Sequence, residues 1–309
     1  MFSKELAMPY HNLEWFEYMN TESRLQEGIS LHQEGKLDQA ELIYQQILQV
    51  NPENAEVLHL LGTIAYQVEK YDLAVNLINQ AIEIDNRQPV FLKSLGCILQ
   101  ERKKLREAIQ AYQEAIELDP ADSKIHKNLG DALKEQGELE QAIDAYNKAL
   151  EFNPHNAETY NNLGTVLQDK GNLDPAIAAY RKALEINPNL ANTYYNLGNA
   201  LREQGNLEHA VKTYHKALKI NSSDSVEVLN NLGLTLQEQG NLEHAIETYR
   251  KALKTNPNST NAHNNLGNAL WKQGNLEHAI ETYHKALEIN PNNAITYYNL
   301  GNILREQGE

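Results

Sequence analysis

The sequence predicts an all-α fold, an α-solenoid in which short helix pairs stack into one array. Glycine recurs at a fixed interval of 34 residues, apart from one interval of 35 between Gly198 and Gly233. A fixed period in this range is the signature of a repeat architecture. Within each interval, two segments show the apolar spacing of an α-helix, and in most repeats a second glycine separates them. The 309 residues are therefore expected to form one repeat array rather than two conventional domains.

The first helix of each repeat is well illustrated by 191–204. Tyr194, Leu197 and Leu201 lie three or four residues apart there, which places them on one face of an α-helix. Gly205 follows directly and is expected to end the helix. Glycine suits that place because it adopts the positive φ of a helix C-terminal turn without steric cost.

The second helix of the same repeat is predicted over 207–220, where small apolar residues share a face with a tyrosine. A glycine inside a helix costs about 0.5–1 kcal/mol relative to alanine. Gly198 therefore needs a compensating contact, and Ala210 and Ala217 are the small residues that two closely approaching helices would place against it. Tyr214 would fill the space beside them. One pair of helices cannot bury its apolar faces alone, so neighbouring pairs must stack.

Aligned on the recurring glycine, the chain divides into an N-terminal extension, eight complete repeats and the first helix of a ninth repeat. The predicted boundaries are 1–20 for the extension and 21–54, 55–88, 89–122, 123–156, 157–190, 191–225, 226–259, 260–293 and 294–309 for the repeats. Leu13, Phe16 and Met19 give the extension the spacing of a short amphipathic helix. We expect this helix to cap the first repeat, the alternative being an arm that docks on a partner.

The last predicted segment, 294–309, is a first helix without its second helix. Leu300 and Leu304 are therefore expected to be exposed as an apolar stripe, although terminal repeats normally need a polar outer face. Exposed apolar strips recruit partners, so self-association through this segment is expected. A fragment of a longer protein is the alternative explanation for the half repeat.

The residues shared by nearly all repeats are leucine and glycine at positions seven and eight, alanine at position 20, tyrosine at position 24 and alanine at position 27, and six of the eight complete repeats have proline at position 32. This pattern resembles the tetratricopeptide repeat family, and the match covers 21–309. The resemblance implies a right-handed superhelix with first helices lining a concave groove and second helices on the convex back. Position four, often tryptophan in that family, is leucine, histidine or tyrosine here. The pentatricopeptide family, which binds RNA, fits the 34-residue interval and the acidic charge less well.

Asparagine occupies position six in six successive repeats, on the face that the resemblance places in the groove. Asparagine is a poor helix former, so its repetition needs a reason. Its amide offers one acceptor and two donors, which match a peptide backbone. The run looks like the asparagine ladder of O-GlcNAc transferases; duplication and hydrogen bonds between neighbouring helices are the alternatives. The predicted peptide-binding residues are Asn128, Asn162, Asn196, Asn231, Asn265 and Asn299 at position six, Asn199, Asn268 and Asn302 at position nine, and Tyr195, Tyr298, Trp271, Arg202 and Arg305.

The composition excludes several classes of partner. The chain has 27 Lys and Arg against 42 Asp and Glu, a formal charge of −15, which disfavours nucleic acid and anionic membranes. No apolar run approaches the length of a transmembrane helix, and the first 20 residues lack the apolar core of a signal peptide. Cys97 is the one cysteine, so no internal disulfide can form. A cytoplasmic location is therefore expected.

No catalytic or metal-binding constellation stands out from the repeat. His209 and His215 lie six residues apart and therefore face opposite sides of their helix. We expect no metal site, no cofactor and no enzymatic activity. The carboxylate clamp of chaperone-binding repeats, with lysine at position five and asparagine at position nine, occurs in no repeat. Binding of chaperone tails is therefore not expected.

Two classes of function remain. The first is a non-enzymatic scaffold that binds extended peptide segments of a protein partner in an asparagine-lined groove. The second is the N-terminal substrate-recognition part of a larger enzyme, such as a glycosyltransferase of the O-GlcNAc transferase type, whose catalytic domain is absent from this chain.

Overall fold

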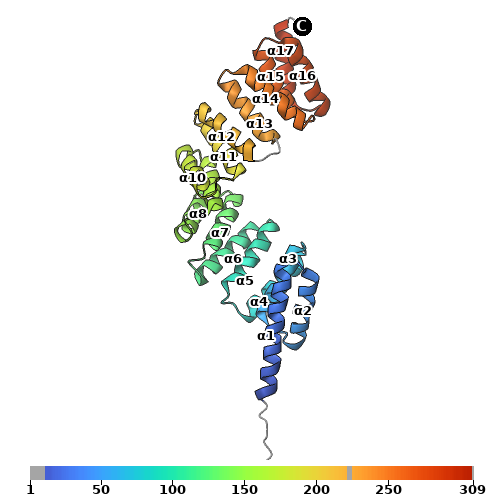
Figure 1. The fold of residues 1–309 in the computed structure, drawn as a ribbon, viewed down its shortest axis with the longest axis vertical. Coiled ribbons are helices and arrows are strands. Elements are labelled where there is room, and N and C mark those ends of the chain that lie inside the picture. The colour runs from blue at the N-terminus through green and yellow to red at the C-terminus, as the bar shows by residue number, and fades with distance from the viewer. Residues whose placement is uncertain (1–10, 221–224, 308–309) are drawn as a thin grey trace, which may run out of the picture. The chain divides into compact units, whose positions relative to one another are not determined.

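A computed structural model describes residues 11–220 and 225–307, and there it consists of α-helices joined by short turns (Figure 1). The first helices of the repeats are α1 (His11–Gln33), α3 (Ala55–Gln67), α5 (Pro89–Glu101), α7 (Ser123–Gln136), α9 (Ala157–Asp169), α11 (Ala191–Glu203), α13 (Val226–Glu238), α15 (Thr260–Lys272) and α17 (Ala294–Gln307). The second helices are α2 (Leu37–Val50), α4 (Tyr71–Ile84), α6 (Leu105–Leu118), α8 (Leu139–Phe152), α10 (Leu173–Ile186), α12 (Leu207–Ile220), α14 (Leu242–Thr255) and α16 (Leu276–Ile289). The predicted all-α array of stacked helix pairs is confirmed.

The recurring glycine of each first helix lies against the second helix of its own repeat. A Cβ atom on Gly198 would lie only 2.6 Å from Cε1 of Tyr214, whose side chain is fully buried. Six other repeats bring glycine and tyrosine together in the same way, while Gly62 lies against Ile78 instead. Position eight has no side chain because the tyrosine ring occupies the place of a Cβ atom. The sequence predicted that Ala210 and Ala217 would lie against Gly198, whereas the three nearest atoms all belong to Tyr214.

The turn inside each helix pair needs a residue with left-handed backbone geometry. Six of these turns use glycine, with φ between 76° and 90°, and Gly205 is one of them at 83°. Glu69 and Lys103 take φ values of 59° and 60° in the turns that precede α4 and α6. Residues with a side chain are strained in this region, so these two turns are less favourable than the other six.

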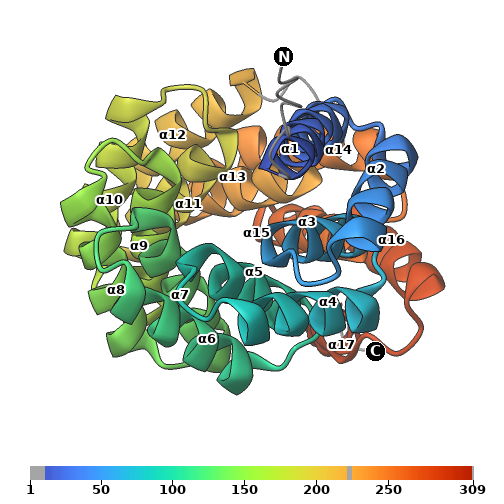
Figure 2. The same cartoon turned by 90° about the horizontal axis from the view of Figure 1, so that it is seen from below.

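The chain separates into two compact units, Met1–Phe152 and Asn153–Glu309. In both units each helix packs on the next one along the chain, and successive first helices also contact one another. Figure 2 shows α3, α5 and α7 on the inner side of the first unit, with α2, α4, α6 and α8 outside them. In the second unit, α9, α11, α13 and α15 likewise lie inside α10, α12, α14 and α16. We call the surface of these inner helices the first-helix face.

The C-terminal helix α17 differs from the expectation of an exposed Leu300. Leu300 is only 7% exposed and joins Ile303 in the apolar core of the second unit, because position seven faces the preceding helix pair. Leu304 is half-buried. The exposed apolar side chains of α17 are Ile295, Tyr297 and Tyr298. The prediction of an exposed apolar stripe was therefore wrong for Leu300.

At the other end, α1 begins at His11 and continues without a break into the first repeat. The predicted boundary at residue 21 therefore falls inside a helix. Residues 1–10 and the side chains of Leu13, Phe16 and Met19 lie outside what the structure describes. None of the described helices combines the length and the apolar character that crossing a membrane requires.

Candidate peptide-binding site

The asparagines at position six join neighbouring first helices in the second unit. Asn196 Nδ2 donates to Asn161 Oδ1 at 3.2 Å, and Asn299 Nδ2 donates to the equivalent Asn264 Oδ1 at 3.2 Å. The acceptors occupy position five of the preceding repeat. The amide of Asn231 lies 2.9 Å from Asn199 Oδ1. These contacts match one of the alternatives from the sequence, hydrogen bonding between neighbouring helices.

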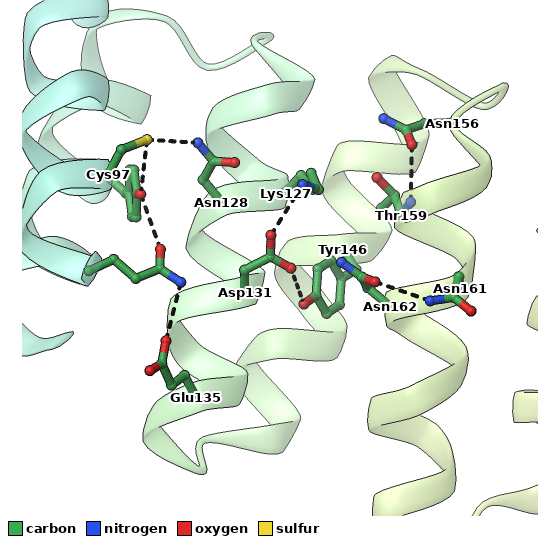
Figure 3. A network of polar contacts seen from close by, with 12 residues as sticks. Cys97, Lys127, Asn128, Asp131, Glu135, Tyr146, Asn156, Thr159, Asn161 and Asn162 are labelled. Carbon is green, nitrogen blue, oxygen red and sulfur yellow. Dashed lines mark hydrogen bonds and ion pairs between the residues drawn. The ribbon is translucent and has the colours of Figure 1, made fainter. Parts of the chain in front are cut away.

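These hydrogen bonds use the side-chain Nδ2 donors of the asparagines and leave the Oδ1 acceptors of three of them without a partner among the described residues. The Oδ1 atoms of Asn196, Asn231 and Asn299 accept no hydrogen bond from the described residues, and all three side chains are half-buried. Asn265 forms no hydrogen bond to another described side chain, and Asn162 Oδ1 accepts from Asn161 at 3.3 Å (Figure 3). Asn196, Asn231 and Asn299 therefore offer side-chain carbonyl oxygens, which can accept from the backbone N–H groups of a peptide.

The asparagines at position nine hold the buried tyrosines of the second helices. Tyr214 donates to Asn199 Oδ1 at 2.7 Å, and Tyr283 donates to Asn268 Oδ1 at 2.6 Å. Burial raises the pKa of Tyr214 to about 12, so its phenol remains a donor at neutral pH. In α17, Asn302 Oδ1 accepts from Arg305 at 3.4 Å instead. The Oδ1 atoms of Asn199 and Asn268 therefore bind the buried tyrosines of the second helices and point away from the surface of the first-helix face.

In the first unit, positions five and nine of the first helices carry a cysteine thiol and charged side chains in place of asparagine amides (Figure 3). Asn128 Nδ2 donates to Cys97 Sγ at 3.4 Å, and burial raises the pKa of that thiol. Lys127 pairs with Asp131 at 3.3 Å, and Asp131 also accepts from Tyr146 at 2.6 Å. The charges are thus neutralised within the surface, and asparagine amides do not continue beyond Asn128 towards the N-terminus.

Three of the five predicted aromatic and arginine anchors contact the next repeat. Trp271 Nε1 donates to Glu306 at 2.8 Å, and Arg202 pairs with Glu238 at 3.1 Å. Both contacts join position 12 of one first helix to position 13 of the next. This pairing was not predicted from the sequence, although an acid at position 13 was a visible signal. Tyr195 hydroxyl accepts from Asn231 at 3.0 Å, whereas Tyr298 is 70% exposed.

A pocket of about 510 Å³, which was not predicted from the sequence, opens between α3 and α5. His59 and Phe91 form part of its lining, with ring centroids 4.8 Å apart, and His59 Nε2 lies 2.8 Å from Ser94 Oγ. Burial, with Lys93 as a second cause, lowers the pKa of His59 to about 4. The imidazole is therefore neutral at physiological pH.

Helix pairs of this length, closed by a left-handed turn and packed through a glycine–tyrosine contact, define a tetratricopeptide repeat protein. A tetratricopeptide repeat model matches residues 31–93. The model described as the cilia and flagella-associated protein 70 C-terminal domain matches residues 98–298, which is more than half of the chain. The chain belongs to this family. The narrower resemblance to O-GlcNAc transferases is not what the family models name, and it stays an expectation.

Solved structures share the fold. YrrB, described as a TPR protein with an unusual peptide-binding site, is 26% identical with a TM-score of 0.53, covering 62% of this chain and 97% of its own. MamA is 29% identical with a TM-score of 0.52, covering 56% of this chain and 94% of its own. The Cut9–Hcn1 complex, at 19% identity and a TM-score of 0.59, covers 87% of this chain and 52% of its own. No curated protein matched the chain in sequence.

Proposed function

We propose that this chain is a non-enzymatic scaffold that holds extended peptide segments along the first-helix face of its second unit. The observation that supports this most directly is that Asn196, Asn231 and Asn299 donate their Nδ2 groups to the preceding repeat, while their Oδ1 atoms accept no hydrogen bond from the described residues. Such a row accepts from peptide N–H groups whatever the peptide sequence is. The peptide-binding site for which YrrB is described supports the same class of function.

A triple variant, Asn196→Ala, Asn231→Ala and Asn265→Ala, tests this proposal. The probes are fluorescent 15-residue peptides without secondary structure, selected on a peptide array with the unmutated chain. We expect binding measured by fluorescence anisotropy to weaken at least tenfold while helical circular dichroism is retained. The matched control, Asn189→Ala, Asn258→Ala and Asn292→Ala, changes the same number of exposed turn asparagines and should bind normally.

Backbone methylation of the same peptides tests the direction of the hydrogen bonds. N-methylation removes amide donors and keeps the carbonyl groups and side chains. If Oδ1 atoms hold the peptide, methylated probes should lose affinity for the unmutated chain. The position-six asparagines would be rejected as the binding site if methylated probes bound the unmutated chain undiminished, or if unmethylated probes bound the triple variant undiminished.

The description of the family supports a proposal for the place of action. Its name comes from a cilia and flagella-associated protein. We place the scaffold in the cytoplasm, with cilia or flagella as the structures at which it would hold peptide segments. Microscopy of a fluorescent fusion tests this placement. The role as the recognition part of a larger glycosyltransferase remains the alternative, and a catalytic domain in the same polypeptide would support it.

A further inference from the structure

The pocket between α3 and α5 combines an apolar wall with two carboxylates. It is lined by the N-terminal ends of both helices and by the turn that joins α4 to α5. Its volume of about 510 Å³ lies within the range of about 300–1,000 Å³ that is typical of ligand pockets. The apolar wall is formed by Leu60, Val90 and Phe91, and the carboxylates belong to Glu56 and Asp85. None of the described residues in the lining is a lysine or an arginine.

The residue at position five explains why no cation of the chain enters this pocket. At the next junction, between α5 and α7, Lys93 occupies position five, and its Nζ lies 3.2 Å from Asp122 Oδ2 in the turn before α7. The second repeat has His59 at position five, and its Nε2 lies 2.8 Å from Ser94 Oγ instead. The neutral imidazole brings no charge to the turn before α5. The chain therefore pairs a cation with the turn at one junction and leaves the other junction acidic.

The two carboxylates of the pocket remain available to a cation from outside the chain. Glu56 is exposed and forms no ion pair with a described residue. Asp85 accepts from Gln88 Nε2 at 2.9 Å, and this hydrogen bond is the main cause that holds the pKa of Asp85 below its usual value. The Arg87 side chain is 87% exposed, and its Nε lies 4.0 Å from Asp85 Oδ1, so this ion pair is weak. Asp85 is therefore ionised at neutral pH and only weakly neutralised.

We propose that this pocket binds an arginine side chain of a partner protein. The guanidinium pairs with Glu56 and Asp85, because its planar fork of N–H donors matches carboxylate geometry. It also stacks on aromatic rings, and Phe91 supplies one in the lining. The methylene groups pack on Leu60 and Val90 while the charged end reaches the carboxylates. A lysine ammonium has no planar face, so it fits the pocket less well.

An arginine within a polypeptide fits this pocket better than free arginine does. A free amino acid carries an α-carboxylate, and the lining offers carboxylates and no cation to receive it. The first unit repels that group as well, because residues 1–152 contain 26 acidic and 14 basic residues. A peptide-bonded arginine lacks this negative charge. The site is separate from the asparagine face of the second unit, so it goes beyond the function proposed above.

Methyl NMR of the full chain, titrated with N-acetyl-arginine N-methylamide, tests the proposal. The methyl signals of Leu60 and Val90 should shift and saturate, because both side chains line the pocket. The citrulline analogue keeps the shape and loses the charge, so it should bind at least tenfold more weakly. The lysine analogue and free L-arginine should each bind at least threefold more weakly. The triple asparagine variant should bind the probe normally, which separates this site from the proposed peptide face.

Two variants with matched controls locate the site. Glu56→Gln removes one carboxylate and should weaken binding at least threefold, whereas Glu83→Gln removes the same charge from an exposed position of α4 and should not. Val90→Lys places a cation of the chain in the pocket and should weaken binding at least tenfold. The next repeat has Lys124 at the same position, so the variant should fold normally. Val50→Lys, at an exposed position of α2, adds the same charge and should bind normally.

Equal binding of the arginine and citrulline analogues would overturn the proposal, because the carboxylates would then contribute nothing. Equal binding of the arginine and lysine analogues would overturn the choice of a guanidinium. The pocket would be excluded as the site if Glu56→Gln and Val90→Lys both left binding unchanged, or if the Leu60 and Val90 signals did not shift.

Discussion

The hydroxyl of each buried second-helix tyrosine depends on the residue at position nine of the same repeat. Tyr283 donates to Asn268 at 2.6 Å. Tyr249 belongs to a repeat whose position nine is Leu234, and its buried hydroxyl has no partner among the described residues. Tyr44, with an isoleucine at that position, has no described partner either. A buried hydroxyl without a hydrogen bond destabilises the fold, so the same tyrosine has opposite effects in different repeats.

We therefore expect opposite results from two matched substitutions. Tyr283→Phe removes a formed hydrogen bond and should lower the free energy of unfolding by about 1 kcal/mol. Tyr249→Phe removes an unpaired hydroxyl and should raise it by about 1 kcal/mol. Urea unfolding followed by circular dichroism measures both. An equal loss in the two variants would mean that Tyr249 bonds to Gln237, whose Oε1 is also buried without a described partner.

His59 should make the first unit sensitive to acid. Its pKa is lowered from 6.5 to about 4 by burial and by Lys93, so the folded state favours the neutral ring. The unfolded chain takes up the proton first as pH falls. The stability that neutral His59 contributes is therefore complete above pH 6.5 and is lost progressively down to about pH 4. The loss should be on the order of 3 kcal/mol.

Urea unfolding at pH 7 and pH 4.5 measures this loss, with His59→Gln as the comparison. Glutamine does not titrate, so the variant should lose less stability between the two pH values than the unmutated chain. Equal losses in the two proteins would assign the acid sensitivity to other groups.

The sequence was sufficient to find the asparagine run but not the partners of its amides. Asn196 bonds to a residue 35 positions earlier, across two turns and a second helix. The choice of that partner depends on the rotamers of both side chains and on the spacing between first helices. The repetition of asparagine at position six shows that the residue matters there. The partner of each amide can be assigned only from the three-dimensional structure.

At the scale of elements, the helices were predictable because their signals are local. The predicted ranges 191–204 and 207–220 correspond to Ala191–Glu203 and Leu207–Ile220. Leu300 was misplaced for a different reason. An apolar residue on a helix shows that something covers it, but the pattern does not tell which neighbour does. Only the packing of α17 against the preceding pair resolved that question.

The turn before α4 offers a stabilising substitution. Glu69 has φ of 59°, where six equivalent turns use glycine. Left-handed geometry costs a residue with a side chain about 1–2 kcal/mol, and glycine loses part of that gain through its flexible unfolded state. Glu69→Gly should therefore stabilise the first unit by about 0.5–1 kcal/mol, seen as a higher melting temperature. The reverse change at Gly171, whose φ is 79°, should destabilise the second unit.

At the scale of the molecule, the two units differ in charge as well as in the chemistry of their first-helix faces. Residues 1–152 contain 26 acidic and 14 basic residues, whereas residues 153–309 contain 16 and 13. Five of the six position-six asparagines belong to the second unit. The acidic charge is thus concentrated in one unit, and the proposed backbone-binding face lies in the other. The association rate of a peptide is therefore expected to depend on the charge of the first unit, and its dissociation rate on the asparagines of the second unit.

This separation predicts distinct kinetic effects for charge and for the ladder. Long-range charge mainly sets association rates, whereas short-range contacts mainly set dissociation rates. Basic probes should associate faster than acidic probes of equal length at about 50 mM salt, and the difference should shrink at about 500 mM because salt screens the field. The triple asparagine variant should keep these association rates and dissociate faster. Surface plasmon resonance separates the two rates. A triple variant that changed association alone, or probes whose association ignored charge and salt, would contradict this division between the acidic unit and the asparagine face.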